Sequence, residues 1–170
     1  QIEISMTPFQ IEGIKPQPGK IGFIAGSSNN PEKCWPPEKW IQLASQILQA
    51  QPVAQIHLYG TKTDCFITRK INNEFPIDRV FDHAGETNLQ ELASELASCA
   101  QAIGNDTGGI HLANATGTPV TVLYGPTNPL VTGPIFESSR TIIKPTKKHT
   151  TCNSYITKLD SESVFQKLEI

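Results

Sequence analysis

The octapeptide Gly104 to His111 (GNDTGGIH) carries residue types that could build an anion site. Apolar residues precede it and a run with helical character follows, an order that predicts a strand, a tight turn and a helix. Asp106 is placed to cap that helix, and Gly108 and Gly109 let a ligand approach the backbone closely. A helix start offers free N–H groups and the positive end of the dipole, which suits a diphosphate. His111, one turn later, would face the same ligand. The alternative interpretation is a plain strand-to-helix turn.

Length and composition narrow the class of protein. The chain has 170 residues, 38% of them hydrophobic and 18% charged, with a formal net charge of −2. This is enough for one globular domain with a core, and the charge argues against a nucleic-acid partner. No apolar run approaches the roughly 20 residues that span a bilayer, and the first ten residues lack the pattern of a signal peptide. Four widely spaced cysteines fit neither a zinc site nor a disulfide framework, so we expect a cytoplasmic protein.

Hydrophobic spacing predicts strands and helices in alternation. A helix is expected to begin at the prolines 36 and 37, and another near residue 89, with Thr87 and Gln90 spaced as its capping box. The predicted strands are 20–25, 54–59, 80–81, 101–104, 119–124 and 141–143, and the helices cover 37–48, 64–73, 89–97, 109–116 and 160–170. This alternation predicts an α/β fold, a Rossmann-like doubly wound parallel sheet.

Polar, glycine-bearing loops follow the predicted strands, at residues 26, 60, 85, 106–109 and 125. In a parallel sheet these loops meet at the carboxyl edge, where ligands bind at the switch in strand order. The chain has neither G-x-G-x-x-G nor G-x-x-x-x-G-K-[ST], which disfavours a dehydrogenase and a P-loop enzyme.

Five segments in order resemble the C-terminal domain of the heptosyltransferase family, which adds ADP-heptose to the lipopolysaccharide inner core. They are GSS at 26–28 with KCWPPEKW at 33–40, HAGETNLQELA at 83–93, NDTGGIHLA at 105–113, GTPV at 117–120, and YGPTNP at 124–129 with TGP at 132–134. The resemblance runs from about residue 21 to residue 134, and loosely to the end.

This resemblance implies one half of a GT-B enzyme, in which two Rossmann-like domains flank the active site. Residues 1–19 are then a leading or linker segment, and residues 20–170 form the domain that binds the nucleotide-sugar donor. The N-terminal acceptor domain, which in the family carries the general base, is expected to be absent from this chain. A natural single-domain relative is the alternative.

The resemblance also implies roles for residues. Lys33 would neutralise the donor phosphates, although a solvated surface lysine is the plain alternative. Amides of the glycine turn would bind the diphosphate, and Asp106 would contact the sugar hydroxyls or orient these amides. His111 would either donate to the departing phosphate or brace the Asp106 turn. The donor-binding set is Ser27, Ser28, Lys33, Asp64, Thr87, Asp106, Thr107, Gly108, Gly109 and His111.

Some positions depart from the family pattern. Asp64 is the nearest carboxylate for the ribose hydroxyls, Cys34 stands where a basic residue is common, and Asn128 stands where an aspartate is expected. Glu86 and Asp82 are candidates for a general base by position only, and surface carboxylates are the plainer interpretation.

The implied reaction is glycosyl transfer with inversion from ADP-heptose. The alternatives are another GT-B enzyme, for a different sugar or an epimerisation, and a non-catalytic nucleotide-binding module. We expect no cofactor and no metal, because a helix start and a lysine can replace a cation. The expected partners are a nucleotide-sugar donor and, through the absent domain, a lipid-linked oligosaccharide acceptor, at the inner face of the inner membrane. Lys144, Lys147 and Lys148 could approach anionic lipid or lie in a solvated loop.

Overall fold

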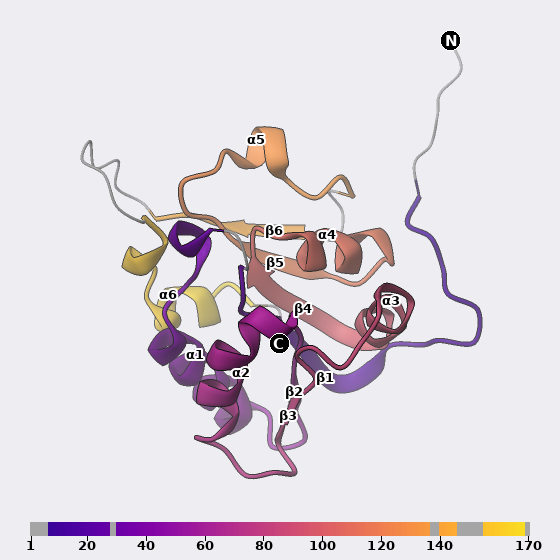
Figure 1. The fold of residues 1–170 in the computed structure, drawn as a ribbon, viewed down its shortest axis with the longest axis horizontal. Coiled ribbons are helices and arrows are strands. Elements are labelled where there is room, and N and C mark those ends of the chain that lie inside the picture. Colours follow the sequence, from indigo (N-terminus) through magenta and orange to yellow (C-terminus); the bar gives the residue numbers. More distant parts are fainter. Residues whose placement is uncertain (1–6, 28–29, 137–139, 146–154, 169–170) are drawn as a thin grey trace.

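A parallel sheet forms the centre of the molecule in the computed structural model, which describes residues 7–27, 30–136, 140–145 and 155–168. The strands are β1 (Gln17–Ile24), β2 (Gln55–Leu58), β3 (Val80–Asp82), β4 (Cys99–Asn105), β5 (Val120–Leu123) and β6 (Arg140–Ile143). Their order is β3-β2-β1-β4-β5-β6, and every neighbouring pair is parallel. The predicted doubly wound sheet is therefore confirmed (Figure 1).

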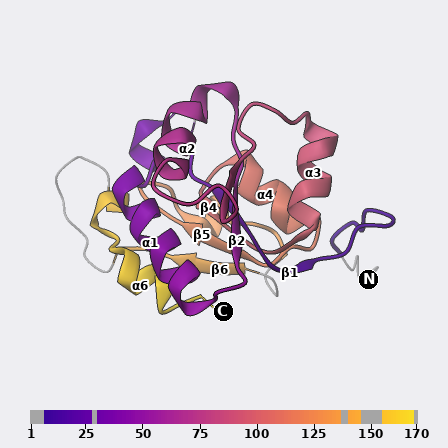
Figure 2. The same cartoon turned by 90° about the horizontal axis from the view of Figure 1, so that it is seen from below.

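Helices cover both faces of this sheet. They are α1 (Pro37–Ala50), α2 (Cys65–Asn72), α3 (Leu89–Ala97), α4 (Gly108–Ala115), α5 (Pro129–Thr132) and α6 (Ser161–Phe165), with 3-10 turns η1 (Pro31–Lys33), η2 (Lys62–Asp64) and η4 (Tyr155–Lys158). The two views place α1 and α6 on one face and α3 and α4 on the other (Figure 2). None of the helices in the described ranges is both long and apolar enough to cross a bilayer.

Each face of the sheet has its own core, because successive strand residues point to opposite sides. Ile21 and Phe23 of β1 pack toward α1, whereas Ile24 packs toward α3 and α4. Trp35 and Trp40 are fully buried and pack against each other, with 5.1 Å between their ring centroids. The layer that contains these two rings also has the larger cluster of buried hydrophobic residues, so it is the larger source of hydrophobic stabilisation.

Most helix ends lie within two residues of the sequence expectations, and the clearest differences are in α3 and α6. The capping box of α3 is formed by Asn88 and Glu91, not by Thr87 and Gln90, because Asn88 Oδ1 accepts from the amides of residues 90 and 91. The closing helix α6 is shorter than the expected 160–170 and begins after its cap, Asp160. α1 begins at Pro37, as predicted.

The strand order reverses at β1. Its neighbours are β2 on one side and β4 on the other, so the chain leaves β1 and β4 in opposite directions. The segment that ends in η1 follows β1, and α4 follows β4. These two connections meet at the carboxyl edge of the sheet, where a doubly wound fold places its ligand.

Candidate functional site

The start of α4 is an open helix N-terminus. Thr107 is its N-cap residue, with extended backbone (φ −141, ψ 167) and no capping hydrogen bond from its side chain. Asp106 therefore does not cap this helix, contrary to the sequence expectation. The first-turn amides have no acceptor within the helix, and a Cβ built on Gly108 would meet nothing within 4 Å. The Thr107 hydroxyl is also buried without a hydrogen-bond partner. Several donors are thus free for an anion at this point.

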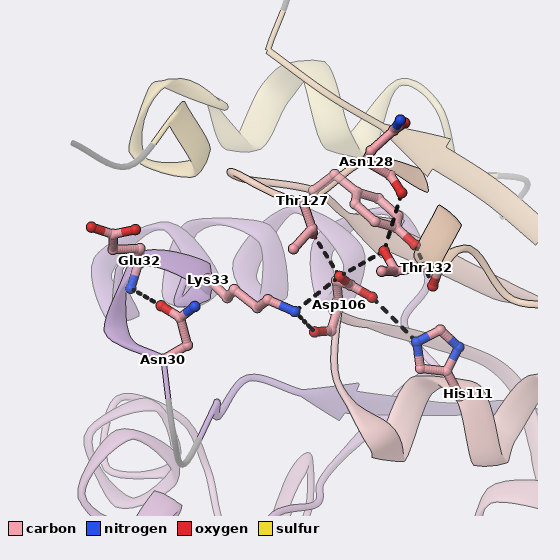
Figure 3. A network of polar contacts seen from close by, with 9 residues as sticks. Asn30, Glu32, Lys33, Asp106, His111, Thr127, Asn128 and Thr132 are labelled. Carbon is pink, nitrogen blue, oxygen red and sulfur yellow. Dashed lines mark hydrogen bonds and ion pairs between the residues drawn. The ribbon is translucent and has the colours of Figure 1, made fainter. Parts of the chain in front are cut away.

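Asp106 lies at the centre of a polar network instead (Figure 3). Its side chain is 2% exposed, and its Oδ2 accepts from Lys33 Nζ at 3.1 Å. The same oxygen accepts from the hydroxyls of Thr127 at 2.6 Å and Thr132 at 3.2 Å. His111 Nε2 lies 3.2 Å from Oδ1. Burial alone would raise the pKa of Asp106, but the bonds from His111, Thr127 and Lys33 outweigh it and hold that pKa well below the usual range.

Lys33 reaches this carboxylate from the other side of the switch point. It ends η1, whose N-cap Asn30 accepts from the Glu32 amide at 3.0 Å. Its ammonium also donates to the backbone oxygen of Asp106 at 3.3 Å. The predicted lysine therefore lies at the start of α4 and not at another edge of the sheet. With its side chain 22% exposed, it is neither a fully solvated surface lysine nor a buried one.

His111 contacts Asp106 directly, so the structure shows the bracing geometry that the sequence left as one of two options. The ring is 38% exposed. A histidine that holds Asp106 Oδ1 while part of its ring faces solvent can still turn its other edge to a ligand.

A pocket of about 490 Å³ opens beside the start of α4, within the size range of small-molecule sites. It brings together five predicted residues, Asp64, Thr87, Thr107, Gly108 and Gly109. One wall is apolar and includes Ile24, Tyr59, Leu89 and Leu92. Leu89 is 71% exposed although it belongs to a hydrophobic stripe, which is consistent with a side chain that lines an open cavity. An apolar wall next to free amides suits a ligand with a flat base and a charged tail.

Asp64 lies in this pocket but its carboxylate faces its own turn. Oδ2 accepts from the amide of Thr61 at 2.8 Å and from its hydroxyl at 2.7 Å. The Asp64 side chain also fills the space over Gly26 and Gly60, since a Cβ on Gly26 would lie 2.1 Å from Asp64 Cγ. Both glycines are thus needed to admit Asp64, and its part in holding this loop is structural.

The other predicted positions are placed as follows. Ser27 is half-buried and lies three residues after the end of β1, where its carbonyl accepts from the amide of Asn30 at 3.1 Å. Ser28 lies outside the described residues, as do Lys147 and Lys148. Asn128 caps α5 through Oδ1, which accepts from the Leu130 amide at 3.2 Å, a task that needs no negative charge.

The two candidate bases differ in their surroundings. Asp82 is engaged within the fold: Oδ2 accepts from Thr68 and Oδ1 from the amide of Ala84. Glu86 lines a separate pocket with His83 and the outer face of α3. Cys34 does not replace the basic residue expected there, because a thiol never carries a positive charge; burial raises its pKa and keeps it neutral. Within the described ranges, no three His, Cys, Asp or Glu side chains are grouped as a metal site would require.

Sequence reasoning missed three partners of this site. Thr127 and Thr132 were noted only as parts of a motif, yet both donate to Asp106. Asn105 is fully buried; its amide donates to the carbonyl of Ala25 at 2.7 Å and its Oδ1 accepts from the Trp35 amide at 3.2 Å. It thereby ties the β1 connection to β4. The available signal was an asparagine that ends a largely apolar strand and an aspartate that directly follows it.

Comparison with known proteins assigns the chain to a family. Residues 4–161 match the family described as Glycosyltransferase family 9 (heptosyltransferase). The chain belongs to glycosyltransferase family 9. It is 36% identical over 128 residues to Lipooligosaccharide heptosyltransferase 2 of Haemophilus influenzae, a match over 73% of this chain and 36% of that protein.

Solved structures agree with this family 9 assignment. The E. coli ADP-heptose lipopolysaccharide heptosyltransferase II aligns with a TM-score of 0.77 and 25% identity, over 92% of this chain and 46% of that one. The E. coli heptosyltransferase WaaC, solved with ADP, has the same fold, with a TM-score of 0.73 and 23% identity over 87% of this chain and 42% of that one. This chain thus spans less than half the length of these relatives.

Proposed function

We propose that this family 9 chain binds the nucleotide-sugar donor of an inverting heptosyltransferase, with ADP-heptose as donor and the lipopolysaccharide inner core as the site of transfer. One observation carries the proposal. The residues of the open α4 start, with the orphan hydroxyl of Thr107, line a pocket with an apolar wall, and the ammonium of Lys33 lies against Asp106, directly before the N-cap of that helix. Amides and an ammonium are ligands for a diphosphate, and the apolar wall offers a surface on which the adenine ring can lie. Family membership favours heptose transfer over the epimerase and the non-catalytic module.

In this mechanism the acceptor hydroxyl oxygen forms a bond to the anomeric carbon while the bond from that carbon to the phosphate oxygen breaks. The bonding electrons pass to the nucleoside diphosphate, which leaves from the opposite face. Negative charge grows on the leaving phosphate in the transition state. Fixed amide dipoles at Gly108 and Gly109, together with the Lys33 ammonium, would stabilise that charge without reorganising.

The acceptor hydroxyl must also lose a proton to a base. Asp82 is engaged in two hydrogen bonds, and Glu86 lies at a different pocket from the open amides. We therefore assign the base to the acceptor-binding domain that the GT-B architecture implies. The lipid-linked acceptor would be bound there, at the cytoplasmic face of the inner membrane.

The proposal extends to the absence of a metal requirement. The Lys33 ammonium and the α4 dipole supply positive charge where other enzymes hold a cation on the diphosphate. We expect ADP binding to be unchanged by EDTA.

Titration calorimetry with ADP tests the proposal. The 170-residue chain should bind ADP saturably and weakly, and should transfer no heptose when given ADP-heptose and an acceptor. Inorganic phosphate and adenosine, as parts of the ligand, should each bind more weakly than ADP. No saturable signal up to millimolar ADP would refute the proposal.

A further inference from the structure

The motif from Thr127 to Thr132 has no part in the function derived so far, yet both of its threonines contact the candidate site. It forms the turn after β5 and the short helix α5, which Figure 1 shows standing at the edge of the sheet. Leu130 and Val131 of this helix are 93% and 80% exposed, and Pro129 is its one buried residue, so apolar packing holds only its first residue. Its polar attachments to Asp106 are therefore the informative contacts.

Three donors converge on a single oxygen, Asp106 Oδ2. The Thr127 hydroxyl makes the shortest contact, 2.6 Å, against 3.1 Å for Lys33 and 3.2 Å for Thr132. The Thr132 hydroxyl has a second acceptor at 3.3 Å, the carbonyl of Asn128. A hydroxyl has one hydrogen to donate, so Thr132 can serve only one acceptor at a time. Thr127 is the constant neutral donor to this carboxylate.

The Lys33 ammonium has three hydrogens. Two are directed to Asp106, one to Oδ2 and one to the backbone oxygen. A nearly buried carboxylate that lost a hydroxyl donor would draw the ammonium closer, since an unmet acceptor is costly in a place that water does not reach. The ammonium would then have less freedom to meet a phosphate.

We propose that Thr127 is a positioning residue for donor binding: its hydroxyl shares Asp106 Oδ2 with Lys33, so that the ammonium stays at the start of α4 with one hydrogen left for the donor diphosphate. This rests on the proposed function, because the diphosphate is its ligand. Thr127 itself acts through Asp106 and Lys33. The α5 turn thereby becomes part of the site, although it lies outside the pocket that is proposed to bind the adenine ring.

Calorimetry on Thr127→Val tests this, because valine keeps the shape and removes the hydroxyl. Thr141→Val, on β6 away from the network, is the matched control. We expect Thr127→Val to weaken ADP binding about five- to tenfold, which is less than the roughly 12- to 150-fold that a direct loss of a hydrogen bond to a charged group implies, because Thr127 acts through Lys33. Adenosine binding should stay within twofold. The control should change neither. The adenosine comparison separates positioning of the phosphate ligand from a general structural defect, which would weaken both ligands equally.

Each outcome bears on the proposal. An ADP affinity of Thr127→Val within twofold of the parent chain, or an equal loss for ADP and adenosine, overturns the role of Thr127 while leaving the proposed function intact. A parent chain that binds no ADP overturns the proposed function itself. If Thr127→Val does not fold, Thr127→Ser and Thr127→Ala replace it: serine should keep the parent affinity and alanine should lose it, and equal losses in both overturn the role.

Discussion

Lys33 and Asp106 form a charge pair at the start of α4, and this pair predicts an unusual result when both are changed. In Lys33→Met the ammonium is lost, and the buried, ionised Asp106 remains beside the proposed diphosphate site. The affinity for ADP should then fall for two reasons: a charge-assisted contact is lost, and two negative charges face each other. Adding Asp106→Asn to Lys33→Met removes the repulsion between the carboxylate and the diphosphate, but it does not restore the lost contact.

The size of each effect follows from the geometry. A hydrogen bond to a charged group contributes about 1.5–3 kcal/mol. If Lys33, 3.1 Å from Oδ2, bridges the two anions, they lie about 6 Å apart, and their repulsion is of order 3 kcal/mol at an effective dielectric constant of 20. Solvent at the partly open site reduces this, so we expect ADP to bind about 30- to 100-fold more weakly to Lys33→Met. The double variant should regain about tenfold.

A double-mutant cycle measured by calorimetry checks this prediction, with thermal unfolding recorded for every variant. Lys70→Met is the matched control, because Lys70 pairs with Glu38 on the surface of α1 and α2. The control should bind ADP as the parent chain does. A double variant that binds ADP no better than Lys33→Met would refute the reasoning, since Asp106 would then exert no repulsion on the ligand.

Three further predictions concern the site and the stability of the sheet. Gly108→Ala should keep or slightly raise the melting temperature, because the added Cβ enters open space in a helix. It should weaken ADP binding, because the same Cβ obstructs the amides at the start of α4. An unchanged ADP affinity would contradict the binding of an anion there. The pKa of Asp106 is lower in the folded chain than its value of about 3.9 in the unfolded chain, so ionised Asp106 stabilises the fold at any pH above about 3.9. This contribution is lost as the pH falls below that value. In a plot of unfolding free energy against pH, Asp106→Asn should therefore show a shallower decrease at acid pH than the parent chain. Burial, aided by Lys20 and His83, lowers the pKa of His57 to about 4, whereas the pKa in the unfolded chain is about 6.5. The fold should therefore lose stability as the pH drops from about 6.5 to about 4, because the unfolded chain binds a proton that the folded chain does not. Denaturant unfolding should show a smaller loss of unfolding free energy between pH 7 and pH 5 for His57→Gln than for the parent chain.

The sequence predicted the sheet because its strands are apolar runs that end in polar loops. Such runs alternate with helical stripes like that of α1, where Trp40, Leu43 and Ile47 are all buried. Local patterns of this kind depend on residues that are close in the chain. Helix ends depend on competition between neighbouring side chains, and there the prediction failed: both Thr87 and Asn88 could cap α3, and the structure uses Asn88.

The contents of the site were harder to predict than its position. The glycine turn and Lys33 could be found from residue type and order, because a helix start after a buried strand is a common position for an anion. The direction of a carboxylate could not be found in that way. Asp106 was expected to cap its own helix, but a lysine and two threonines from other loops compete for it more effectively than the amides of α4 do.

The topology explains why those distant partners win. Lys33 is 73 residues before Asp106 in sequence and Thr127 is 21 after it, yet β1, β4 and β5 are neighbours in the sheet, so the loops that follow them must end close together. Asn105 fixes the spacing by tying the connection after β1 to the end of β4. With the loops held there, the ionised Oδ2 of Asp106, at the end of β4, accepts from the loop after β1 through Lys33 and from the segment after β5 through Thr127 and Thr132. Removing the charge of Asp106 should therefore loosen the approach of the η1 and α5 loops while leaving the strand pairing beneath them intact.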